Sequence, residues 1–299
     1  MTTLAAGFGF APLQVLPATI AGIAYAMRAS RLAGTPRAVP AWRQWCFHLG
    51  LLLIVLTLTS PLGGLAEEHF VAHMAEHLLI ADVGALLVVL GLTAPVLAPI
   101  LKIRVFDALR VLAHPLVALP LWALSLLAWH VPVLHEAAVR HEAVHALQHL
   151  CFVTFGANMW MPLFGPLPQP EWFGNAWKLG YVVAVRMIGA VLANAFVFGG
   201  DAFYDVYEGG DDDQVAAGTV MMVWESLLTI VILGWLFLQT ARQNEERQQL
   251  LDLAAARGVA LTEARATRAV RAGRGAELRA RIEQEANDSK SGDRVGSPP

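Results

Sequence analysis

Long apolar stretches separated by short polar segments make up the first 240 residues of the chain. A helix that crosses the roughly 30 Å hydrocarbon core of a bilayer needs about 20 mostly apolar residues. Seven stretches meet this condition, approximately at residues 8–27, 45–65, 73–99, 115–132, 144–165, 177–199 and 215–239. The pattern therefore predicts an all-α fold: a polytopic membrane protein with a seven-helix transmembrane bundle.

The composition supports this prediction. Of the 299 residues, 56% are hydrophobic and only 15% are charged, whereas an ordinary soluble domain carries about 25% charged residues. The net charge is −3 and no basic domain is present, which argues against a nucleic-acid partner. The two cysteines, Cys46 and Cys151, are too few for a disulfide framework.

The basic residues predict the orientation. Of the 21 Lys and Arg residues, 19 fall on one predicted side, after the first and third spans, at the start of the sixth, and in the tail. By the positive-inside rule, we expect the N-terminus outside and the C-terminus in the cytoplasm. The first basic residue, Arg28, follows the first apolar stretch, so we expect that stretch to be retained as a helix.

The charge distribution divides the chain into three predicted parts. Residues 1–240 form the transmembrane domain, 241–285 a cytoplasmic Arg-rich helical tail, and 286–299 a disordered end. Residues 241–299 hold 20 of the 45 charged residues. We expect a solvated amphipathic helix here. The alternative is that its arginines contact anionic lipid or a protein partner.

Histidines carry the main chemical signal. Eight of the ten lie on the predicted outer side: His69, His73, His77, His130, His135, His141, His145 and His149. The first three enter the third span at intervals of four residues, and the last three enter the fifth span in the same way. This spacing stacks side chains on one helix face, so we expect two facing imidazole ladders, with His130 added from the intervening fourth span.

Two ladders at equal depth favour a metal site, although a single histidine in an apolar helix usually serves packing. Imidazole suits copper, zinc, iron and nickel, and nearby sulfur favours copper. Met74 and Met222 are weaker candidate ligands, as is Asp213 at the mouth of the seventh span. We expect His48 and His114 to be packing residues.

Three charged residues fall near the middle of predicted spans: Asp82, Arg186 and Glu225. Because an ion pair lowers the cost of placing charges at this depth, we predict that Arg186 pairs with Glu225, Asp82 or both. Such a group would act either as a buried structural clamp or as part of a proton or ion path.

Several motifs in order resemble the CtaG-type cytochrome c oxidase assembly factors of bacteria. They are His73-Met74 with His77, Trp129-His130-Val131-Pro132, His145 and His149 leading to Trp160-Met161-Pro162, and Asp213-Gln214 followed by Gly218 and Met222. The resemblance covers roughly residues 8–240. It implies a multi-pass protein of the bacterial plasma membrane that helps to mature a haem-copper oxidase.

The resemblance also implies candidate ligands and partners. The family's motif histidines correspond to His73, His77, His130, His145 and His149, whereas His69 and His141 extend the ladders beyond the motifs. It implies copper as the metal and, on the outer face, oxidase subunits or copper chaperones as partners. The expected role needs no catalytic group, so we do not expect an enzyme.

Two alternatives remain open. Two imidazoles at matched depth are enough for a bis-histidine haem protein, although the sequence has no CxxCH attachment motif. Alternatively, His141-Glu142-Ala143-Val144-His145 reads H-E-x-x-H, the pattern in which two histidines hold zinc and the glutamate acts as base. A seven-span zinc hydrolase is therefore the second alternative.

Overall fold

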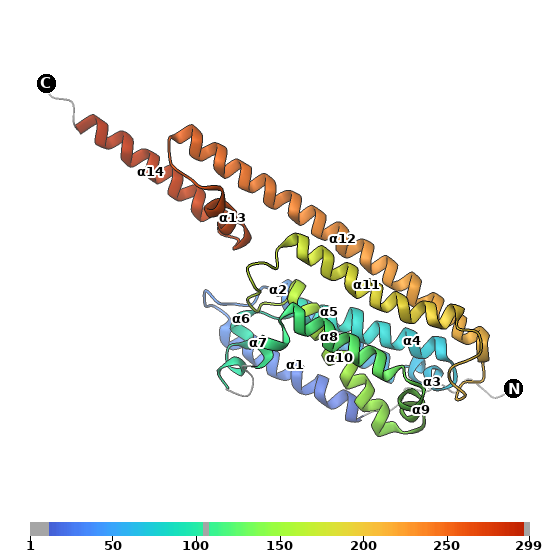
Figure 1. Ribbon diagram of the computed structural model, residues 1–299. Coiled ribbons are helices and arrows are strands. Elements are labelled where there is room, and N and C mark those ends of the chain that lie inside the picture. The colour runs from blue at the N-terminus through green and yellow to red at the C-terminus, as the bar shows by residue number, and fades with distance from the viewer. Residues whose placement is uncertain (1–11, 104–107, 296–299) are drawn as a thin grey trace. The chain divides into compact units, whose positions relative to one another are not determined.

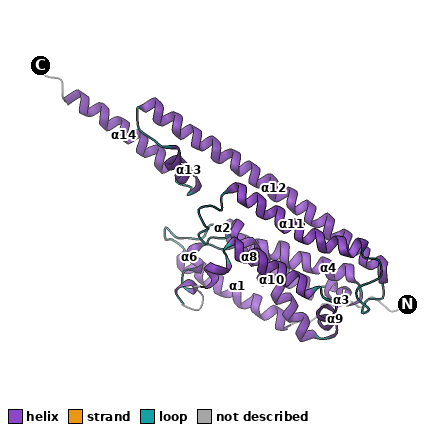
Figure 2. Cartoon of the chain, viewed as in Figure 1, coloured by secondary structure: helices purple, strands orange, loops and turns teal. Residues whose placement is uncertain are grey.

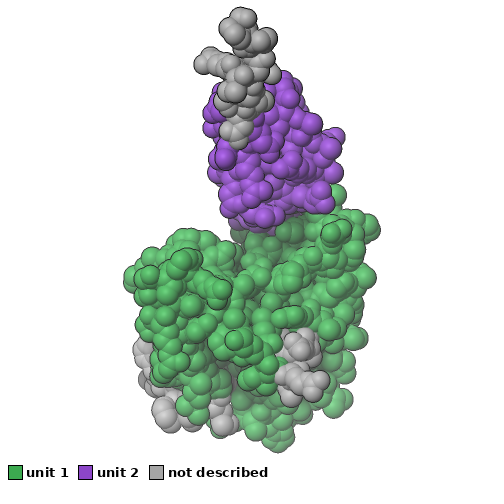
Figure 3. All heavy atoms as spheres, turned by 90° about the vertical axis from the view of Figure 1, so that its left-hand side faces the viewer, with its two compact units in different colours: residues 1–229 green, residues 230–299 purple. Residues whose placement is uncertain are grey.

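The computed structural model describes residues 12–103 and 108–295, and all regular elements in these ranges are helical (Figures 1 and 2). The predicted all-helical fold is confirmed. The chain divides into two compact units, residues 1–229 and 230–299 (Figure 3). The start of the first predicted span, residues 8–11, and the last four residues of the predicted disordered end lie outside the described residues.

The first unit contains most of the helices. They are α1 (Pro12–Leu32), α2 (Ala41–Thr59), α3 (Pro61–Glu68), α4 (Phe70–Leu78), the π-helical turn η1 (Leu79–Gly84), α5 (Ala85–Gly91), α6 (Ala94–Leu97), the short 3₁₀ turn η2 (Ile100–Lys102), α7 (Ala108–Leu112), α8 (Pro115–Trp129), α9 (Pro132–Arg140), α10 (Glu142–Phe164) and α11 (Asn175–Phe198). Helix α12 (Gly210–Arg257) begins in this unit. The second unit contains the rest of α12 together with α13 (Glu263–Arg271) and α14 (Gly275–Val295).

Several helices are long and apolar enough to cross a membrane. Within the described ranges these are α2, the continuous stretch Phe70–Gly91, α11 and α12. A fifth span results if α8 and α9, which meet at 70°, are taken together. The structure thus supports a membrane protein with four or five candidate spans. The count of seven stays a prediction.

Two predicted span boundaries are wrong. The second span was predicted to reach residue 65, but α2 ends at Thr59. Pro61 starts the separate helix α3, whose first turn is capped by the Ser60 hydroxyl, which accepts a hydrogen bond from the Leu62 N–H. The third span was predicted to reach residue 99, but its helix ends at Gly91, four residues before Pro95. Proline begins new helices here because it lacks an N–H group.

Small residues let the central helices approach closely. A Cβ atom on Gly156 of α10 would lie 2.5 Å from the carbonyl oxygen of Ala81 in η1. A Cβ atom on Gly50 of α2 would lie 2.7 Å from the carbonyl oxygen of Gly84. Such contacts are how helices associate in lipid, where packing replaces the hydrophobic effect. They fix α2 and α10 against the helix that begins at Phe70.

The second unit has its own small core. Leu250 and Ala254 of α12 pack against Val270 of α13 and against Leu278 and Ile282 of α14. These residues lie on one face of each helix, and the charged side chains lie on the other faces. Helix α14 continues to Val295, into the segment for which the sequence predicts a disordered end.

Candidate metal centre

Six of the eight predicted outer histidines come together at the end of the first unit where α3, α4 and α9 lie (Figure 1). Helix α4 contributes His73 and His77, and α10 contributes His145 and His149. Each pair is one helical turn apart, with ring centroids separated by 4.3 Å in α4 and 4.2 Å in α10. The spacing predicted from the sequence therefore places each pair on one helix face.

The two helices face each other through these rings. His73 stacks on His145 at 5.3 Å between centroids, and His77 lies 5.6 Å from His149. His130, at the end of α8, lies 6.5 Å from His77. The predicted facing ladders, with His130 beside them, are present in the structure.

The group is buried, and its nitrogen atoms lack partners. His73, His77 and His149 are 0%, 5% and 3% exposed. Among the residues that the structure describes, none forms a hydrogen bond with either ring nitrogen of His77 or His149, or with Nε2 of His73. Because buried polar atoms in proteins are nearly always hydrogen-bonded, such a concentration of buried nitrogens without hydrogen bonds is typical of a site that holds an ion or protons.

Glu76 is a central member of the group. It was not among the ligands predicted from the sequence. It is 1% exposed, and its Oε2 lies 3.5 Å from Nε2 of His149. Ligand atoms of His73, Glu76 and His145 all lie within 4.8 Å of one another, a spacing that suits one metal ion. The signal in the sequence was the interval of three residues from His73, which places Glu76 on the same helix face.

His135 is a second residue that was not among the predicted ligands. It is fully buried in α9, and its ring centroid lies 4.8 Å from that of His73. Its Nε2 is 2.8 Å from the hydroxyl of Tyr207, and its ring stacks on Tyr204 at 4.1 Å. Burial raises the pKa of Tyr207 well above its usual range, so this phenol stays protonated and fixes the position of His135.

The two outermost histidines do not join the group. His69 and His141 are exposed residues that precede α4 and α10, with extended backbone at φ −127° and −134°. The prediction that they extend the ladders by another turn is wrong, because each helix starts one residue later. Helical stacking cannot continue into an extended residue.

Glu142 of the H-E-x-x-H motif is exposed, as is His141, the first histidine of the motif. His145 is the one member of the motif that belongs to the buried group. The arrangement of a zinc hydrolase, with two motif histidines on the metal and the glutamate beside them, is therefore not formed by these residues.

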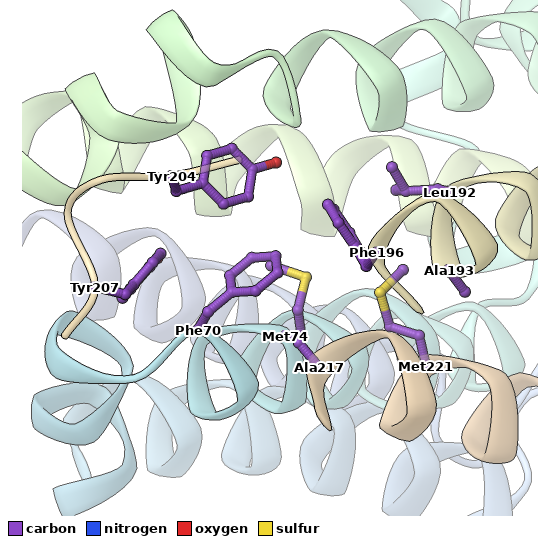
Figure 4. Close-up of a cluster of buried hydrophobic side chains, with 9 residues drawn as sticks. All are labelled: Phe70, Met74, Leu192, Ala193, Phe196, Tyr204, Tyr207, Ala217 and Met221. Atoms are coloured by element: carbon purple, nitrogen blue, oxygen red, sulfur yellow. The ribbon is translucent and has the colours of Figure 1, made fainter. Parts of the chain in front are cut away.

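The sulfur-containing candidates lie in an apolar cluster. Met74 is 1% exposed and packs with Phe70, Phe196 and Met221, as Figure 4 shows. Met222 packs at the edge of the same cluster. In the structure these methionines serve packing between α4, α11 and α12.

Asp213 also has a different role from the predicted one. Its carboxylate accepts hydrogen bonds from the backbone N–H groups of Phe70 at 2.6 Å and Val71 at 3.0 Å, the first two residues of α4. Both oxygens are therefore used to cap the helix that carries His73, Glu76 and His77. Asp213 positions the candidate site without facing it as a ligand.

The predicted pairing of Arg186 with Glu225 is present. The guanidinium donates to the Glu225 carboxylate and also to the Ser226 hydroxyl at 3.2 Å. Asp82 has another partner, because it accepts a hydrogen bond from the Trp224 indole at 3.1 Å. The Arg186–Glu225 pair links α11 to α12. The hydrogen bond between Asp82 and Trp224 links α12 to the turn η1, which directly follows the helix that carries His73 and His77.

Comparison with protein-family models identifies the family. The model of the cytochrome c oxidase caa3 assembly factors (Caa3_CtaG) matches residues 23–243. The chain belongs to this family. In this Caa3_CtaG protein, the buried histidines, Glu76, Asp213 and the Arg186–Glu225 pair all lie within the matched segment, whereas α13 and α14 lie beyond it. The comparisons with curated proteins and with solved structures found no match.

Proposed function

We propose that this assembly factor binds copper at its buried histidine group and passes it to a haem-copper cytochrome c oxidase. The observation that carries the proposal is a set of buried ligand atoms that form no hydrogen bond. Nε2 of His73, Oε2 of Glu76 and Nε2 of His145 are buried and have no hydrogen-bond partner among the described residues, and these three residues are close enough to share one ion. Imidazole and carboxylate together suit a divalent copper ion.

The remaining imidazoles suggest how copper would leave. His77, His130 and His149 continue the group from the three ligands, with ring centroids 4.2 to 6.5 Å apart between neighbours. A copper ion can therefore exchange one ligand for the next without returning to water. Copper is here a cargo, and the protein supplies the successive ligands that it would occupy.

The proposed setting is the plasma membrane of a bacterium. We infer seven spans, with α1 and α10 added to the candidate spans and the bent pair α8–α9 taken as one, an external N-terminus and a cytoplasmic C-terminus. The asymmetric distribution of Lys and Arg supports this orientation. The histidine group would then lie near the outer surface, where oxidase subunits or copper chaperones are the proposed partners.

The test is metal analysis of the detergent-purified protein from cells supplied with copper, zinc and iron together. We expect copper in the parent protein and its loss in a variant with alanine at His73, His77, His145 and His149. The exposed pair His69→Ala and His141→Ala is the matched control and should retain copper. Stoichiometric iron would favour the haem alternative, and stoichiometric zinc would favour the hydrolase; either result would contradict the proposal.

A second experiment tests the delivery step. A strain that lacks the protein should assemble an oxidase with reduced copper content, which metal analysis of the purified oxidase measures. Normal copper content in that oxidase would contradict the delivery role while leaving copper binding itself untouched.

A further inference from the structure

Four arginines of the second unit surround one groove. Arg265 and Arg268 belong to α13, Arg274 lies in the turn after it, and Arg281 belongs to α14. The groove has a volume of about 310 Å³, and Glu277 is the one acidic residue among the described residues that line it. Four positive charges against one negative charge make this a strongly cationic cavity.

A tight turn holds these arginines in place. Helix α13 ends at Arg271, and Gly273 two residues later has a φ of +66°, the left-handed conformation that glycine adopts readily. The Arg274 N–H donates to the Ala269 carbonyl at 2.8 Å, and the Gly273 N–H donates to the Val270 carbonyl at 2.9 Å. This pair of bonds is the Schellman motif, which fixes the exit of a helix. The position of Arg274 relative to α13 is therefore set before any ligand binds.

The groove arginines differ from other arginines of the same unit. Arg247 forms an ion pair with Glu263 at 2.7 Å, and Arg279 donates to the side chain of Gln249 at 3.3 Å. In the described part of the chain, none of the four groove arginines forms an ion pair with a carboxylate within 4.0 Å. Their guanidinium groups remain available for an anion, and guanidinium binds phosphate through two parallel hydrogen bonds.

The groove lies close to the end of the apolar part of α12. A Cβ atom on Gly275, the first residue of α14, would lie 2.7 Å from Cδ of Glu246, so α14 starts beside that residue. Glu246 follows the last residue of the predicted span, Gln239, by seven positions, or about 10 Å along a helix. The headgroup layer of a bilayer extends about 5 to 8 Å beyond the hydrocarbon. Arg274 is therefore within side-chain reach of lipid phosphates.

We propose that this groove binds the phosphate group of an anionic membrane lipid. Clusters of basic residues that directly follow a membrane span attract anionic lipids, and here the fold gathers the basic residues into one cavity. The site lies beyond the segment that the family model matches. The proposal is independent of the copper proposal, since the two sites share no residue.

The test measures lipid binding by native mass spectrometry on the full-length protein in neutral detergent. The probes are phosphatidylglycerol and, as the neutral lipid, phosphatidylcholine. The groove variant carries Arg268→Gln, Arg274→Gln and Arg281→Gln. The control variant carries Arg257→Gln, Arg271→Gln and Arg279→Gln, which removes the same charge from the same unit outside the groove. Helicity and Tm of both variants verify that the unit remains folded.

We expect the parent and the control to bind phosphatidylglycerol at least about tenfold more tightly than the groove variant. Inorganic pyrophosphate should compete for the same site, because it offers the same oxygen atoms to the arginines. If the groove and control variants lost the same amount of phosphatidylglycerol binding, net charge alone would explain the effect. That result would overturn the proposal. Equal binding of phosphatidylcholine, or binding of pyrophosphate without binding of phosphatidylglycerol, would also overturn it.

Discussion

The carboxylate of Asp213 accepts a hydrogen bond from the backbone N–H of Phe70 at 2.6 Å, across 143 positions of sequence. Phe70 is the first residue of α4, where N–H groups have no partner within the helix. The residue before it, His69, offers no side-chain cap. The start of α12 thus supplies the cap for the helix that carries His73, Glu76 and His77.

Replacing Asp213 with alanine should destabilise the protein by about 1 to 2 kcal/mol, because the first turn of α4 loses its cap and its favourable negative charge. The measurement is the Tm of the metal-free protein in detergent. Asp212→Ala is the control, since Asp212 is exposed. If Asp213 were instead a metal ligand, its replacement would weaken copper binding and leave the Tm of the metal-free protein unchanged.

Replacing Glu76 with glutamine should lower copper affinity at least about tenfold while the helices remain folded. The amide retains the size of the side chain but removes the negative charge that offsets the charge of the ion. Competition with a copper chelator measures the affinity, and Glu142→Gln on the exposed surface should bind like the parent. Equal affinity of the Glu76→Gln protein would remove Glu76 from the site.

Replacing Tyr207 with phenylalanine should weaken copper binding about tenfold, which is the usual effect of removing a hydrogen bond to a residue beside a metal. The Tyr207 hydroxyl is 2.8 Å from Nε2 of His135, whose ring lies beside His73. The same chelator competition measures the change. Thr219→Val, an exposed substitution on α12, should have no effect, and unchanged affinity in Tyr207→Phe would show that His135 needs no such support.

Arg186 and Glu225 should behave as a coupled pair. Arg186→Leu alone should lower the free energy of unfolding by about 3 kcal/mol, since it leaves the Glu225 carboxylate without its partner in an apolar environment. Adding Glu225→Gln should recover part of that loss. The effect of the double variant should differ from the sum of the two single effects by about 1 to 3 kcal/mol. Folded yield and Tm of the two single variants and the double variant measure it. Strictly additive losses would contradict the pairing.

Local patterns in the sequence account for the helical fold, the membrane character and the two histidine pairs of the buried group. These features depend on local patterns: apolar length, charge distribution and a spacing of four residues on one helix face. The pairs His73 with His77 and His145 with His149 follow directly from that spacing. That Arg186 pairs with an acidic residue follows from the cost of an isolated charge in lipid, whereas the choice of Glu225 over Asp82 comes from the packing of the helices.

Which side chains face the group depends on how the helices pack in three dimensions. The helices start one residue after His69 and His141, so both histidines are exposed although they continue the interval of four. The inclusion of Glu76 and His135 depends on how α4, α9 and α10 pack, as does the use of Asp213 as a cap. These contacts join residues far apart in the chain, and the direction in which a helix turns its face is set by its neighbours rather than by its own sequence.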